Sequence, residues 1–130
     1  AGPVGQTRTT RRIRISDITG TGRFPPPLDQ RLVDLMGSAI RKEIPIASTT
    51  VRVADLEVHH PPTLERVRAS FKEEPSLYAE MVKDVLMHRP CWPVYRNEAG
   101  RLVMFDDYAV YVVAQNIGLE SVDVQILGES

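Results

Sequence analysis

Cysteine is almost absent from this sequence of 130 residues, in which Cys91 is the only one. A single thiol cannot form an internal disulfide, and it cannot supply the paired cysteines of a zinc knuckle. The sequence therefore excludes a disulfide-stabilised scaffold and a cysteine-based zinc module. Between Pro90 and Trp92, we expect this cysteine to be a small, unreactive hydrophobic residue.

Long apolar runs are also missing. No stretch of the sequence approaches the roughly 18 consecutive apolar residues that a membrane-spanning helix requires, and no secretory signal pattern opens it. We therefore expect a cytoplasmic location and no membrane partner.

The sequence has no overall excess of positive charge, because its formal net charge is −1. The basic residues are nevertheless unevenly placed. Five arginines fall within the first 23 residues, where Asp17 is the only acid; they are Arg8, Arg11, Arg12, Arg14 and Arg23. A locally basic segment can bind phosphate even on a neutral protein. The alternative interpretation is a solubilising tail without a ligand.

The domain organisation follows from length and composition. Residues 1–10 are rich in Gly, Thr and Pro, which predicts a flexible N-terminal arm. Residues 11–130 suit one compact α/β domain, because apolar residues make up 42% of the chain and charged residues 25%, close to globular averages.

The N-terminal half alternates between strand and helix patterns. Residues 12–16 alternate polar and apolar side chains and predict a strand, followed by a Gly- and Pro-rich loop over 19–27. Apolar residues at helical spacing predict a helix over about 29–42, with Asp29 as its N-cap. A second strand is expected within 50–58, and then a short helix capped by Thr63.

The C-terminal half has a clearer order. Ser76 is expected to cap a helix that ends near Pro90, and residues 92–96 and 102–105 read as strands joined by a turn at 97–100. The apolar segment 108–117 is predicted to be a helix with Gly118 as its stop, although its valines leave a strand over 108–113 as an alternative. A last strand contains Val122, Val124 and Ile126.

This order carries a family resemblance. Residues 94–124 resemble the part of the ParB N-terminal domain that holds its second conserved box, and the run Gly-Leu-Glu-Ser-Val-Asp-Val at 118–124 is the best match. A looser match upstream pairs residues 15–18, Arg23 and the 29–42 helix with the opening strand, first box and helix of the family. The resemblance implies an α/β (α+β) fold of ParB/sulfiredoxin-like type, with a small mixed sheet and about four helices.

The chemistry of the family depends on the turn before the buried helix, where glycine and basic residues hold a nucleotide phosphate. By position, this chain has Asp107 in place of the glycine, and Ala109 and Val110 in place of the basic residues. We therefore expect neither sulfiredoxin chemistry nor ParB-type CTP hydrolysis in its usual form. The resemblance still implies phosphate or nucleic-acid binding by Arg23, to which the local charge adds Arg11, Arg12 and Arg14.

A metal-dependent alternative starts from Asp106 and Asp107 at the expected helix start. Two carboxylates repel phosphate unless a divalent cation lies between them. Asp106 and Asp107 can hold Mg²⁺ if His59, His60 or Glu57 completes the ligand set, and such a site can hydrolyse phosphodiesters or nucleotides. The simpler interpretation makes Asp106 an N-cap, Asp107 a solvated acid, and the two histidines part of an exposed loop.

Three functions are therefore open. The first is a ParB-like binding module that engages DNA, or a protein of a DNA-handling system, through its basic arm and lacks the usual catalytic turn. The second is a divergent ParB-like nuclease or nucleotide hydrolase, a class suggested by plasmid fertility-inhibition proteins of this fold. The third is a ligand-free interaction domain.

Overall fold

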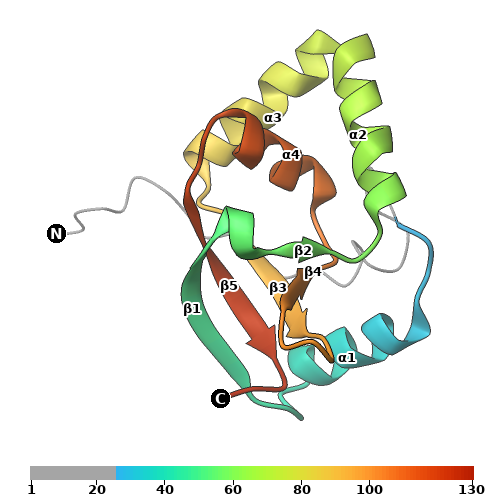
Figure 1. Ribbon diagram of the computed structural model, residues 1–130, viewed down its shortest axis with the longest axis vertical. Helices are drawn as coiled ribbons and strands as arrows, with labels where there is room; N and C mark the ends of the chain where they lie inside the picture. Colours follow the sequence, from blue (N-terminus) through green and yellow to red (C-terminus); the bar gives the residue numbers. More distant parts are fainter. Residues whose placement is uncertain (1–25) are drawn as a thin grey trace, which may run out of the picture.

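The computed structural model describes residues 26–130. The helices are α1 (Gln30–Ile40), α2 (Pro61–Glu73), α3 (Pro75–Met87) and α4 (Tyr108–Asn116), and a short 3-10 turn, η2, spans Val53–Asp55. The strands are β1 (Ile46–Arg52), β2 (Glu57–Val58), β3 (Cys91–Arg96), β4 (Leu102–Met104) and β5 (Ser121–Leu127) (Figure 1). The predicted arm at 1–10 and the predicted strand at 12–16 lie outside the described residues.

The five strands of this part of the chain form one mixed sheet in the order β1-β5-β3-β4-β2. β1 pairs with β5 and β3 with β4 in antiparallel fashion, whereas β3 pairs with β5 and β2 with β4 in parallel. The expected fold class, an α/β chain with a small mixed sheet and four helices, is confirmed.

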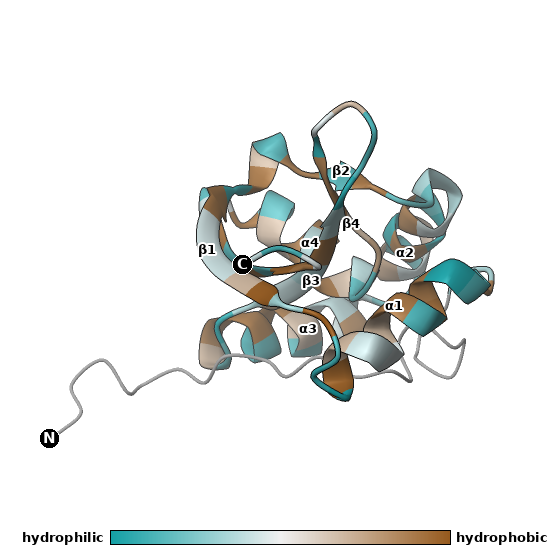
Figure 2. Cartoon of the chain, turned by 90° about the horizontal axis from the view of Figure 1, so that it is seen from below, coloured by the Kyte–Doolittle hydropathy of each residue, from teal (hydrophilic) through white to brown (hydrophobic). Residues whose placement is uncertain are grey.

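Apolar residues cover the two faces of the sheet unequally. The larger core joins α2, α3 and α4 to alternate residues of the central strands, such as Trp92, Val94 and Val124. A smaller cluster joins α1 to Phe105 and Leu127. Hydrophobic and hydrophilic residues alternate along α1, as expected for a helix with one buried face (Figure 2).

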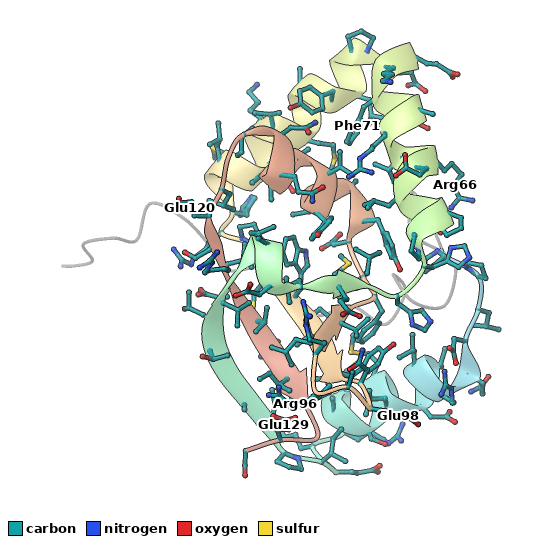
Figure 3. The ribbon with its side chains drawn as sticks, viewed as in Figure 1. Arg66, Phe71, Arg96, Glu98, Glu120 and Glu129 are labelled. Atoms are coloured by element: carbon teal, nitrogen blue, oxygen red, sulfur yellow. The ribbon has the colours of Figure 1, made fainter. Side chains whose placement is uncertain are left out.

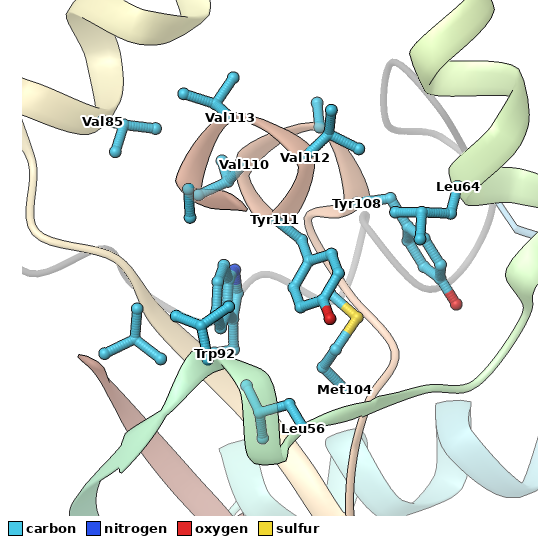
Figure 4. Close-up of a cluster of buried hydrophobic side chains, with 14 of the residues drawn as sticks. Leu56, Leu64, Val85, Trp92, Met104, Tyr108, Val110, Tyr111, Val112 and Val113 are labelled. Atoms are coloured by element: carbon cyan, nitrogen blue, oxygen red, sulfur yellow. The ribbon is translucent and has the colours of Figure 1, made fainter. Parts of the chain in front are cut away.

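The helix-or-strand alternative at 108–113 is resolved in favour of the helix. Every residue from Tyr108 to Ala114 is buried in α4, which lies among α2, α3 and the sheet (Figure 4). A helix that is apolar on all sides can be stable only when it is enclosed in this way. Gly118, at φ +75°, ends it in a Schellman motif, because Leu119 N–H donates to Ala114 O and Gly118 N–H donates to Gln115 O.

The predicted starts of α2 and α3 are wrong by three and two residues, respectively. Neither Thr63 nor Ser76 is a cap, because Pro61 and Pro75 occupy the first helical positions, after His60 and Glu74. Proline suits this position because its fixed φ is helical and its missing N–H is not needed there. Asp29, in contrast, caps α1 as predicted, and it accepts a 3.0 Å hydrogen bond from Arg31 N–H.

The strand expected within 50–58 is divided. β1 ends at Arg52, and η2 turns the chain so that Val53 and Leu56 are buried before β2 begins on the far edge of the sheet. Within residues 26–130, no helix is long and apolar enough to cross a membrane.

Candidate functional site

Polar side chains gather where β2 and β4 end. These strands are parallel, so the loops that follow them leave the same edge of the sheet. His59 N–H donates to Met104 O over 2.9 Å, which continues the pairing of the two strands, and α2 and α4 begin directly afterwards. His60 N–H donates to the Tyr108 hydroxyl over 3.0 Å and thereby joins the start of α2 to the start of α4.

The centre of this region is the His59 ring, which contacts two groups far apart in the sequence. Its Nε2 lies 3.2 Å from Asp29 Oδ2 at the N-cap of α1, and its Nδ1 lies 2.8 Å from the Tyr95 hydroxyl of β3. About a fifth of the His59 and Asp29 side chains is exposed, and Tyr95 is also only partly buried. The site therefore contains a chain of carboxylate, imidazole and phenol.

The surroundings of Asp29 and Tyr95 shift the pKa values of both groups. A hydrogen bond from Arg31 holds the pKa of Asp29 below its usual value, so this carboxyl is ionised at neutral pH. Burial raises the pKa of Tyr95, which keeps its phenol protonated. The Arg31 side chain is itself 86% exposed, so it can contact a ligand while it holds Asp29.

Asp106 and Asp107 occupy different positions from those expected. Asp106 is 2% exposed and precedes the cap, and the cap residue of α4 is Asp107, in the left-handed region with φ 59°. The assignment of Asp106 as cap and Asp107 as a solvated residue of the first turn is therefore wrong. Aspartate is one of the few residues other than glycine that enters this region readily.

The predicted Mg²⁺ site gains no support from the histidines. Both ring nitrogens of His59 have partners, and His60 Nδ1 lies 2.8 Å from the Thr63 hydroxyl. Glu57 contacts Arg101 and Asn97. In the part of the chain that the structure describes, no three His, Cys, Asp or Glu residues are grouped to hold a metal ion. The catalytic and metal roles of Asp106 and Asp107 stay predictions.

The phosphate-binding candidates Arg11, Arg12, Arg14 and Arg23 lie outside the described residues, so their role also stays a prediction. Most arginines of the folded body face carboxylates instead. Arg96 and Glu129, for example, form a two-point pair beside the end of β3 (Figure 3). Further pairs join Arg31 to Asp29, Arg41 to Glu43, Arg52 to Asp55, Arg68 to Glu65, Arg89 to Asp123 and Arg101 to Glu57.

Sequence reasoning missed the site that the structure assembles. Asp29 was expected as a cap and Tyr95 as a strand residue, and His59 was considered as a metal ligand or as part of an exposed loop. Their sequence positions are 30 and 36 residues apart, and no local pattern joins them. The one available signal was that each is a polar group at the end of a predicted element, where functional side chains commonly lie.

No family model matches the sequence, and no curated protein matches it significantly. Among solved structures, sulfiredoxin from Arabidopsis thaliana is similar to this chain with a TM-score of 0.47 and 14% identity, over 64% of this chain and 86% of the other. This likeness supplies no activity, substrate or site for this chain.

Proposed function

We propose that this chain is a nucleic-acid-associated binding domain in which residues 1–25, the N-terminal segment, supply the phosphate contacts. Residues 26–130, the body, do not supply them. The observation that carries the proposal is the separation of charge. Residues 1–25 contain five basic residues and one acid, a formal charge of +4. Residues 26–130 contain eleven basic residues and sixteen acids, a formal charge of −5.

This separation favours one mode of binding. A polyanion is attracted by the arginines of residues 1–25 and repelled by the body, so the phosphate contacts concentrate on one segment. Within the body, seven arginines already form ion pairs with carboxylates. Breaking these pairs to bind phosphate would cost part of the energy that the new contacts provide. The metal-dependent nuclease alternative lacks comparable support, because residues 26–130 assemble no three-residue ligand set.

Two variants that remove the same charge test the proposal. The first replaces Arg11, Arg12 and Arg14 of the N-terminal segment with Ala. The second replaces the three exposed lysines of the body, Lys42, Lys72 and Lys83, with Ala. Binding to a fluorescent DNA duplex is measured over a range of salt concentrations. We expect the first variant to bind more weakly, with a slope of log K against log salt that is flatter by about 3, because each phosphate contact contributes about −0.9.

The lysine variant should bind like the unmodified chain. Equal weakening of both variants would show that only total charge matters and would contradict the proposal. If the unmodified chain shows no salt-dependent binding, residues 1–25 do not engage nucleic acid, and the interaction-domain alternative is favoured.

A further inference from the structure

Asp29 and Tyr95 contact different nitrogens of the His59 ring. Asp29 Oδ2 lies 3.2 Å from Nε2 as an ion-pair partner, and its negative charge favours the tautomer with the ring proton on Nε2. In that tautomer Nδ1 is an acceptor, and the Tyr95 hydroxyl at 2.8 Å donates to it. The proton of the phenol points at a base that the carboxylate holds in place.

The order carboxylate, imidazole, hydroxyl is the arrangement by which proteins activate weak nucleophiles. The carboxylate fixes the tautomer and stabilises the imidazolium that forms when the ring takes a proton. The three groups come from the cap of α1, the loop after β2 and strand β3, so separate elements of the fold hold them in position. A purely structural role needs only satisfied hydrogen bonds and does not require this order.

The surroundings indicate the kind of electrophile. Arg31 lies beside Asp29 with most of its side chain exposed, and its charge also acts on Tyr95. A guanidinium in this position can hold the anionic oxygens of a phosphate group and balance the negative charge that develops during attack.

We propose that Asp29, His59 and Tyr95 form a nucleophilic relay in which the Tyr95 hydroxyl attacks the phosphorus of a phosphodiester. In this step the Tyr95 oxygen forms a bond to phosphorus, and its proton passes to His59 Nδ1. The bond from phosphorus to the leaving oxygen breaks, and that oxygen leaves with the bonding electron pair. The product is a phosphodiester of Tyr95, and no oxidant, reductant or cofactor takes part. The relay is independent of the charge on residues 1–25 and goes beyond the binding function proposed above.

The test uses the full chain and bis(4-nitrophenyl) phosphate, a diester whose nitrophenolate leaves without protonation. We expect release of up to one equivalent of nitrophenolate per chain, and peptide mass spectrometry should locate the 4-nitrophenyl phosphate adduct on Tyr95. Tyr95→Phe should abolish the adduct. His59→Gln should slow labelling by about 100-fold or more, the usual contribution of a general base. Asp29→Asn should slow it by a smaller factor.

The matched control is Tyr78→Phe. It removes the hydroxyl of a partly buried tyrosine whose ring packs against Phe71 on the opposite side of the sheet. This variant should be labelled at the unmodified rate. Thermal unfolding of every variant separates chemistry from folding, because a purely structural network would lower the melting temperature of His59→Gln without changing its labelling rate.

Three results overturn the proposal: no adduct on the folded chain, an adduct on another residue, or equal labelling rates for His59→Gln and the unmodified chain. The DNA-binding measurement is separate. Tyr95→Phe should bind DNA as the unmodified chain does, and loss of binding after changes in residues 1–25 should leave the labelling of Tyr95 intact.

Discussion

Arg89 and Asp123 form a two-point ion pair that joins the segment after α3 to strand β5. Arg89 Nε donates to Asp123 Oδ2 over 2.6 Å, and a second guanidinium nitrogen donates to Oδ1 over 3.2 Å. The Thr50 hydroxyl of β1 also donates to Oδ1, over 2.9 Å. One carboxylate therefore connects three elements that are far apart in the sequence.

This ion pair should make the free energy of unfolding depend on pH in the acid range. The hydrogen bond from Arg89 holds the pKa of Asp123 below its usual value. Its stabilisation is therefore complete above the unfolded carboxyl pKa of about 4 and is lost as the pH falls through the lower folded value. We expect Asp123→Asn to lower the free energy of unfolding by about 1 kcal/mol at pH 7, since the pair is partly exposed, and the difference should shrink in strong acid.

Urea denaturation at pH 7 and at pH 2–3 measures both effects. Glu43→Gln, which removes the exposed partner of Arg41, is the matched control and should change stability much less. If Asp123→Asn lowers the free energy of unfolding as much in acid as at pH 7, the stabilisation does not come from the ionised Asp123 carboxylate.

The end of α1 contains a residue under backbone strain. Lys42 has φ 61°, and its N–H donates to Ala39 O while Glu43 N–H donates to Ser38 O, which is a Schellman motif with lysine in the place that glycine prefers. Lys42→Gly should therefore raise the free energy of unfolding by about 0.5–1 kcal/mol. Lys83→Gly, the same change inside α3, should lower it by about 1 kcal/mol. Chemical denaturation of the two variants should show opposite signs.

Tyr108 fixes the start of α4 to the start of α2. Its side chain is almost fully buried, and its hydroxyl accepts the His60 N–H over 3.0 Å. Tyr108→Phe leaves that N–H without this partner, so we expect a loss of about 1–3 kcal/mol. Tyr111→Phe removes a hydroxyl with only a long 3.4 Å contact from Gln115 and should cost less. Thermal melts of the two variants provide the comparison.

The ionisation of Tyr108 can be followed separately, because burial raises the pKa of its phenol to about 12. In a titration followed by ultraviolet absorbance, the Tyr108→Phe variant should lack a phenol that ionises near that pH. If the absorbance change of Tyr108→Phe near that pH equals that of the unmodified chain, Tyr108 is more accessible than its burial indicates.

The smaller core should be sensitive to a single truncation. Met36 of α1 is fully buried against the Phe105 and Leu127 side of the sheet. Met36→Ala should cost about 2–5 kcal/mol, the usual range for a large buried side chain. Leu86→Ala is the control, because Leu86 is 57% exposed, and it should have little effect. Similar losses in both variants, measured by urea denaturation, would contradict the assigned burial.

Features set by neighbours in the chain were predictable. Asp29 caps α1, because a short acidic side chain reaches its own helix amides. Gly100 and Gly118 take positive φ at the hairpin and at the end of α4, where residues with a side chain are disfavoured. The apolar spacing of residues 108–117 predicted a helix, and its enclosure by α2, α3 and the sheet confirmed it.

Features that depend on distant contacts were decided only by the tertiary structure. The sequence alone indicated most of the helical and extended segments, because periodicity and capping act over a few residues. It did not determine that β2 joins the edge beside β4, nor that His59 lies between Asp29 and Tyr95. Those relationships arise when the sheet forms and brings together the ends of elements some 30 residues apart, and no short-range pattern encodes that arrangement.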